Sequence, residues 1–228
     1  MGEQVTFPSN GGTAEGYLAL PARGSGPAVI VIQEWWGLDD HIRSIADRLA
    51  GEGFVAMAPD LYHGTVTHEP DEAQKLAMGL QMDQAAQDIN GAATYLGTRA
   101  DLTGPGIGAD GFCMGGALAI WTATLAPTVT AAVAFYPALP WEMMAPEWGN
   151  FESKAALIHT DEDEGGTSAT GIETATAAIE GAGGEVTGYD YPGTEHAFFN
   201  DTRPEVYNAE ASGQAWDRTL SFLREKLS

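Results

Sequence analysis

Apolar runs of strand length alternate with helix-length segments along most of the chain, from Pro27 to the C-terminus. Buried strands are expected at Pro27–Gln33, Phe54–Pro59, Ala131–Pro137, Ala155–Thr160 and Glu185–Pro192. Helices are expected at about Asp39–Leu49, Asp71–Leu96, Ala117–Ala126, Ser168–Gly181 and Pro204–Leu227. This alternation predicts parallel βαβ units.

The N-terminal segment has a different pattern, with short strands near Val5 and at Ala14–Pro21 on either side of a turn at Asn10-Gly11-Gly12. It predicts a small antiparallel opening to the sheet. Together, the segments predict one α/β domain over residues 1–228, with a mostly parallel sheet of about eight strands and helices on both faces.

The charge of the chain is strongly acidic, with 32 Asp and Glu against 10 Lys and Arg in 228 residues. Such a surface repels nucleic acids and anionic membranes, so we expect neither as a partner. It also disfavours strongly anionic substrates unless an arginine acts locally. Two interpretations stay open for the acidic surface: general solubility, or adaptation to high salt.

The N-terminus carries neither a basic region nor an apolar segment of the signal-peptide type, and no run approaches the roughly 18 apolar residues of a membrane span. The single cysteine, Cys113, cannot form an internal disulfide. We therefore expect a soluble cytoplasmic protein, either a monomer or a homodimer.

Cys113 lies at the centre of Gly111-Phe112-Cys113-Met114-Gly115-Gly116. This G-x-C-x-G pattern matches the G-x-S-x-G nucleophile elbow, with sulfur in place of oxygen. Glycines are needed there because side chains would collide in the tight strand-to-helix turn. The N-terminus of the following helix favours the thiolate over the thiol, so Cys113 is the candidate nucleophile; its alternative role is a buried small side chain.

A base and an orienting acid should follow the nucleophile in the chain. His196, in the turn after the last predicted strand, is the candidate base. The acid should follow Ala155–Thr160, where four acidic residues occur in a row. We favour Asp163 and keep Asp161 and Glu164 as alternatives.

The remaining histidines have simpler interpretations. His159 lies inside a predicted strand and is expected to be buried and hydrogen-bonded. His41, His63 and His68 match no zinc spacing, so structural or surface roles are expected and no metal or other cofactor is predicted.

These residues resemble the dienelactone hydrolase family from about Val29 to the C-terminal helix. The resemblance rests on four segments in the family's order and spacing: Val29–Leu38, Ala58–Gly64, Gly111–Ala119 and Gly193–Asp201. It implies an α/β-hydrolase fold and a hydrolase of small esters or lactones.

The resemblance also implies residue roles. The family's Cys-Asp-His triad falls on Cys113, Asp163 and His196, and a glutamate that governs ionisation of the thiol falls on Glu34. The oxyanion hole would be formed by the backbone N–H groups of Met114 and Trp35.

The chain departs from the family in its substrate pocket. Enzymes that hydrolyse dienelactone hold its carboxylate with two arginines, and Pro70 and Asn200 occupy those positions here. The family's aromatic residues on the long helix are replaced by Gln74 and Ala77. Dienelactone is therefore not expected as the substrate. A more apolar pocket is expected, with these aromatic lining residues: Trp35, Trp36, Phe198 and Phe199.

The expected chemistry is acyl transfer through a thioester on Cys113, with activated esters and lactones favoured over amides. Two alternatives belong to other classes. One is a binding protein that kept the fold and pocket without turnover. The other is a redox thiol, which is disfavoured because the chain has no second cysteine to resolve a sulfenic acid.

Overall fold

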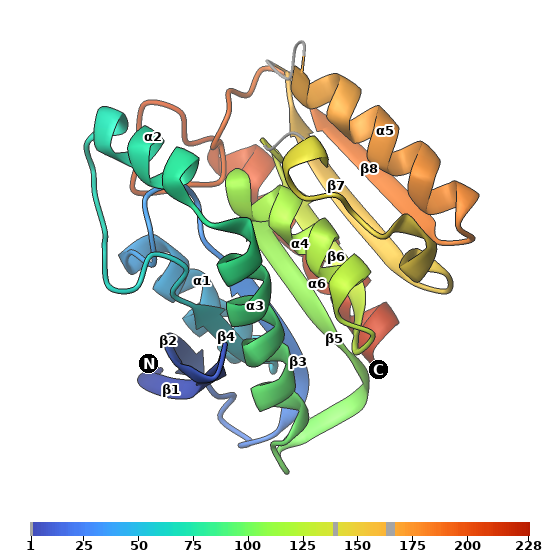
Figure 1. Ribbon diagram of the computed structural model, residues 1–228. Coiled ribbons are helices and arrows are strands. Elements are labelled where there is room, and N and C mark those ends of the chain that lie inside the picture. The colour runs from blue at the N-terminus through green and yellow to red at the C-terminus, as the bar shows by residue number, and fades with distance from the viewer. Residues whose placement is uncertain (1, 139–140, 163–166) are drawn as a thin grey trace.

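The computed structural model describes residues 2–138, 141–162 and 167–228, so Asp163 and Glu164 lie outside the described residues. An eight-stranded sheet runs through the molecule in the order β1-β2-β4-β3-β5-β6-β7-β8 (Figure 1). The strands are β1 (Glu3–Ser9), β2 (Gly12–Ala19), β3 (Gly26–Ile32), β4 (Val55–Pro59), β5 (Leu102–Phe112), β6 (Val129–Phe135), β7 (Ala155–Asp161) and β8 (Glu185–Tyr191).

The N-terminal hairpin is antiparallel, as the sequence predicts, and β2 also pairs antiparallel with β4. Asn10 and Gly11, in the turn between β1 and β2, both have positive φ angles, which explains the Asn-Gly pair there. All pairings from β4 to β8 are parallel. The structure is thus the α/β-hydrolase fold, with a mostly parallel sheet.

Helices cover both faces of the sheet (Figure 1). The described residues also form two 3₁₀ turns, between β6 and β7. The helical elements are α1 (Asp40–Gly51), α2 (Pro70–Gly79), α3 (Met82–Gly97), α4 (Met114–Leu125), η1 (Trp141–Met143), η2 (Trp148–Phe151), α5 (Thr167–Gly181) and α6 (Ala209–Leu227). One hydrophobic cluster joins the sheet to α3, α4 and α5, and a second joins the opposite face to α1 and α6. The alternation of apolar side chains along the central strands therefore fills two cores.

The single long helix expected at Asp71–Leu96 is wrong, because the segment forms α2 and α3. Leu80, between them, has an extended backbone with φ −62° and ψ 119°, which interrupts the helical hydrogen bonds. Apolar spacing on both sides of this break concealed it. The break places the end of α2 beside the loop after β4, where Leu76, Leu80 and Tyr62 line one cavity.

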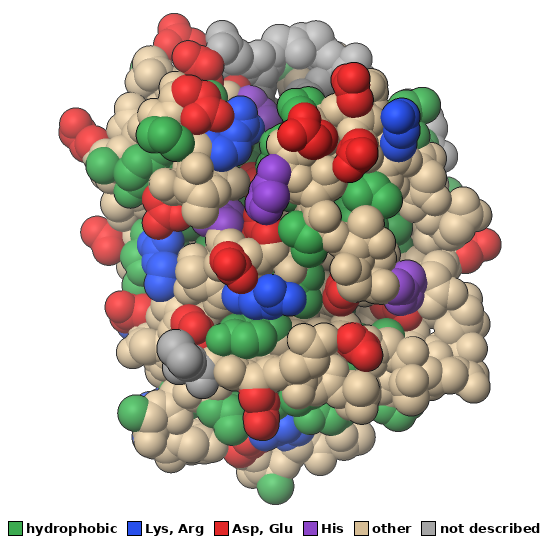
Figure 2. Space-filling view, turned by 90° about the vertical axis from the view of Figure 1, so that its left-hand side faces the viewer, with side chains coloured by type: hydrophobic (Ala, Val, Ile, Leu, Met, Phe, Trp, Pro, Cys, Tyr) green, Lys and Arg blue, Asp and Glu red, His purple; other side chains and the backbone are tan. Residues whose placement is uncertain are grey.

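Acidic side chains are spread over the face in Figure 2, and they do not gather into one patch. Among the described residues, no helix is both long and apolar enough to cross a membrane.

Candidate active site

Cys113 lies between β5 and α4, in a backbone conformation that non-glycine residues rarely adopt, with φ 56° and ψ −119°. A Cβ at Gly111 would lie 1.9 Å from the Gly115 carbonyl oxygen, and one at Gly115 would lie 2.3 Å from the Ile32 carbonyl oxygen. No side chain fits at either position. The predicted elbow is therefore present, and α4 begins at Met114, directly after the thiol.

His196 lies in the loop after β8 and faces Asp161, with 3.5 Å between its Nδ1 and the Asp161 Oδ2. The Asp161 side chain is 1% exposed and stands at the end of β7. Burial lowers the pKa of His196, but hydrogen bonds with Asp161 and Cys113 outweigh this effect and raise the pKa to about 10. Asp161 and Cys113 thus both favour the protonated form of the ring.

Among the acidic residues that the sequence offers as partners of His196, Asp161, which the structure describes, is in contact with it. Asp161 is one of the two alternatives, whereas the favoured Asp163 lies outside the described residues, as does Glu164.

Glu34 follows β3 and is buried. Its Oε2 accepts a 2.8 Å hydrogen bond from the Asn200 amide, and its Oε1 accepts one of 3.3 Å from the Tyr136 hydroxyl. Burial raises the pKa of Glu34, while the charge of His41 and the hydrogen bond from Asn200 oppose that rise. Two donors thus fix the carboxyl group in the cavity wall.

A cavity of about 300 Å³ opens at the thiol. Its lining residues are Glu34, Trp35, Trp36, Ala77, Cys113, Met114, Ala138, His196, Ala197 and Arg203. The structure therefore brings together most of the residues singled out from the sequence, and the aromatic wall is formed by the two tryptophans.

Phe198 and Phe199 do not line this cavity. Both are fully buried in the cluster between the sheet and helices α1 and α6. Phe199 stacks on Phe112 with ring centroids 5.4 Å apart. The pocket-lining role expected for these two residues is thus replaced by core packing, because the turn after His196 directs both rings into this cluster.

The sequence does not predict the roles that three residues have in the site. The Tyr136 ring lies edge-on to the His196 ring with centroids 4.9 Å apart, and the Asn200 amide donates a hydrogen bond to Glu34. Arg203 lines the cavity, and its guanidinium lies 5.8 Å from the Trp36 ring centroid. Of these three, the sequence singles out only Asn200, as the site of an absent arginine, and does not predict its hydrogen bond to Glu34.

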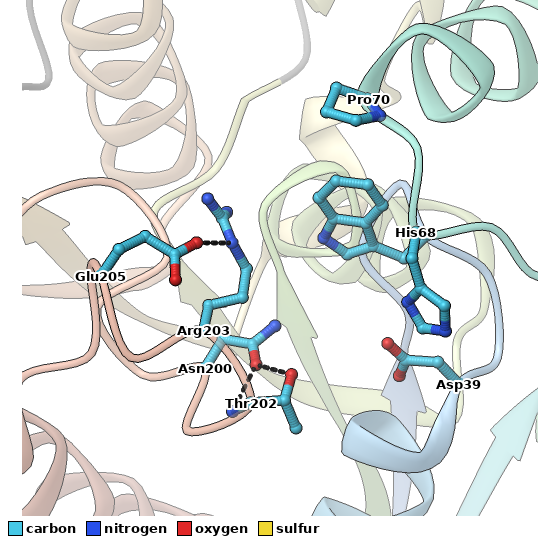
Figure 3. A pocket seen from close by; sticks show the side chains of 8 residues that line it. Asp39, His68, Pro70, Asn200, Thr202, Arg203 and Glu205 are labelled. Carbon is cyan, nitrogen blue, oxygen red and sulfur yellow. Dashed lines mark hydrogen bonds and ion pairs between the residues drawn. The ribbon is translucent and has the colours of Figure 1, made fainter.

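A second, polar cavity of about 280 Å³ adjoins the first and shares Trp36 and Arg203 with it. In Figure 3, Asp39, His68 and Pro70 lie on one side, and Asn200, Thr202, Arg203 and Glu205 on the other. The Arg203 Nε pairs with the Glu205 carboxylate at 3.0 Å. Arg203 thus stands at the boundary of an apolar and a polar space.

His159 and His41 have structural contacts, and the burial and hydrogen bonding expected for His159 are confirmed. His159 is buried between the Tyr191 hydroxyl at 2.9 Å and the Thr219 hydroxyl at 3.0 Å, and burial lowers its pKa to about 3. His41 pairs with Asp201 at 3.2 Å. Within the described part of the chain, no group of three or more His, Cys, Asp or Glu side chains is arranged to hold a metal ion.

The model of the dienelactone hydrolase family matches residues 14–227. The protein usf of Aquifex pyrophilus is 35% identical over 235 residues, covering all of both chains. A protein of Aquifex aeolicus, provisionally named a carboxymethylenebutenolidase, is 33% identical over 234 residues, again covering both chains fully.

Among solved structures, a Klebsiella pneumoniae protein provisionally described as a dienelactone hydrolase superposes with a TM-score of 0.85. It is 27% identical in sequence, and the match covers 99% of this chain and 98% of that one.

Proposed function

Because the chain belongs to the dienelactone hydrolase family, whose members are α/β hydrolases, we propose that it hydrolyses small esters or lactones with Cys113 as the nucleophile. The observation that carries the proposal is that Cys113 and His196 line the same cavity, with the buried Asp161 carboxylate 3.5 Å from the imidazole. A nucleophile, a proton carrier and an orienting acid in this order are what acyl transfer requires.

In the first step the Cys113 thiolate attacks the carbonyl carbon, forming a C–S bond while the carbonyl electrons move to oxygen. The N–H groups of Met114 and Trp35 stabilise this oxyanion; Met114 begins α4, so its N–H has no partner within the helix. When the oxyanion collapses, the C–O bond to the alkoxy group breaks and the imidazolium of His196 donates the proton to the departing oxygen.

In the second step the neutral His196 ring accepts a proton from water, which attacks the thioester carbonyl. The acid is released, and the thiolate and the imidazolium are restored. We assign Asp161 as the orienting carboxylate because of its contact with His196; Asp163, favoured from the sequence, is tested beside it below. In the same proposal, Glu34 acts on the ionisation of the thiol from the cavity wall.

The substrate we propose is an uncharged ester or lactone, not dienelactone. The Asn200 amide is hydrogen-bonded to Glu34, and Pro70 carries no charge. Neither position can therefore hold a carboxylate as an arginine does. The tryptophans and Ala77 give the cavity a mostly apolar wall. A cytoplasmic location and a monomeric or homodimeric state belong to the proposal as well.

The test compares hydrolysis of p-nitrophenyl acetate by the wild-type protein and by Cys113→Ala. We expect turnover that the variant loses, while its melting temperature stays near that of the wild type. Ser44→Ala serves as the control, because that hydroxyl donates to the His41 carbonyl within α1, away from the cavity. Full activity in Cys113→Ala contradicts the assignment, and absence of activity in the wild type with this and other activated esters favours a binding protein.

A further inference from the structure

A further cavity of about 280 Å³ lies at the junction of α2 and α3, beside the loop after β4. Its lining residues are Leu61, Tyr62, His63, Lys75, Leu76, Gly79, Leu80, Gln81 and Gln84. Leucine side chains and the tyrosine ring form its walls, and the polar groups come from four residues. We call it the α2–α3 cavity.

Tyr62 and Met114 separate the α2–α3 cavity from the catalytic one. Tyr62 lines the α2–α3 cavity and Met114 lines the catalytic cavity, and the Tyr62 hydroxyl donates to the Met114 sulfur at 3.6 Å. Burial and the negative charge of Cys113 both raise the pKa of Tyr62. The Tyr62 and Met114 side chains thus contact each other from opposite cavities.

Helix α2 forms the rest of the wall. Ala77 faces the catalytic cavity, while Leu76 and Leu80 face the α2–α3 cavity. Ala73 is the only fully buried residue of α2, so the helix is held by a small contact area. Leu76, Ala77 and Leu80 pack against the same hydrophobic cluster as Met114. An unbranched methionine adapts its shape at little cost.

We propose that the α2–α3 cavity receives the hydrocarbon chain of the acyl group, passing between Met114 and Tyr62 while the ester carbonyl lies at Cys113. The inference rests on the proposed function and adds a substrate class to it: esters of medium-chain aliphatic acids as well as acetyl esters. The walls suit an uncharged chain because its methylene groups leave water on entering an apolar space.

Gly79 provides the means of testing this. It lines the α2–α3 cavity, its φ is not in the left-handed region, and a Cβ built there meets no atom within 4 Å. Gly79→Phe therefore places a phenyl ring at the lining of the cavity, away from the catalytic residues. Gly97 is the matched control: it is the last residue of α3, is exposed, and is equally free of neighbours at its Cβ.

The experiment measures kcat/KM for p-nitrophenyl acetate, butyrate and octanoate with the wild type, Gly79→Phe and Gly97→Phe. We expect Gly79→Phe to lower kcat/KM for the octanoate ester about tenfold or more, which corresponds to about two methylene groups left in water. The kcat/KM for the acetate ester should change by less than about twofold. Gly97→Phe should match the wild type on all three esters, and melting temperatures check the fold.

The inference is overturned if Gly79→Phe lowers kcat/KM equally for p-nitrophenyl acetate and p-nitrophenyl octanoate, or does not lower it for the octanoate ester. It is also overturned if the wild-type protein hydrolyses p-nitrophenyl acetate but not p-nitrophenyl octanoate. These outcomes leave the proposed function intact, whereas a wild-type protein inactive on acetate and on every other activated ester refutes the proposed function itself.

Discussion

Replacing Asp161 by asparagine keeps the shape of the side chain and removes the charge that faces His196. The carboxylate is 1% exposed and its Oδ2 lies 3.5 Å from the imidazole Nδ1. A hydrogen bond to a charged group contributes about 1.5–3 kcal/mol. At 1.36 kcal/mol per factor of ten, kcat should fall about 10- to 150-fold if this bond holds the ring in place for catalysis.

The same substitution should lower the pKa of His196 from about 10, because the hydrogen bond with Asp161 is one of the interactions that raise it. The assays are p-nitrophenyl acetate hydrolysis and a titration of the His196 ring by NMR. Asp163→Asn and Glu164→Gln are made in parallel. If Asp161→Asn retains wild-type kcat while Asp163→Asn loses it, the orienting carboxylate is Asp163 and the reasoning from the contact is refuted.

Three more predictions concern buried carboxyl groups and their donors. Glu34→Gln removes a titratable carboxyl group from the wall that Cys113 shares, so the pH dependence of alkylation of the thiol by iodoacetamide should change; an unchanged pH profile would leave Glu34 with a structural role only. Asn200→Leu leaves the Glu34 Oε2 without its donor and should reduce the free energy of unfolding in urea by about 1–3 kcal/mol; no loss would mean that another group, or water, replaces the donor. Burial raises the pKa of Asp110 well above its ordinary value, opposed by Arg48, so the folded state binds the extra proton and stability should fall as pH rises from about 4 through the folded pKa. Asp110→Asn should flatten that decline above pH about 4, and an equal decline in both proteins would contradict it.

The sequence predicted the scaffold well because its signals are local. The runs that form β3 to β8, the hairpin before them and the glycines around Cys113 each follow from the chemistry of a few adjacent residues. The break at Leu80 was missed because apolar spacing continues on both sides of it.

The side-chain partners within the site depend on distant segments. Glu34 and Asn200 are separated by 166 positions and Glu34 and Tyr136 by 102, and nothing in their neighbourhoods signals either bond. Phe198 and Phe199 were expected in the pocket because they follow His196, but the direction of a ring after a turn is set by the core it meets. Adjacent acids such as Asp161 and Asp163 cannot be separated without the geometry of the loop.

The claim that Cys113 is the nucleophile is tested most directly by alkylating the one thiol in the chain. Iodoacetamide is added in steps, the fraction of modified protein is measured by intact mass, and p-nitrophenyl acetate hydrolysis is measured on the same samples. The account predicts that activity falls in proportion to modification and vanishes when one group per chain is attached. Activity that survives complete modification of Cys113 would contradict it.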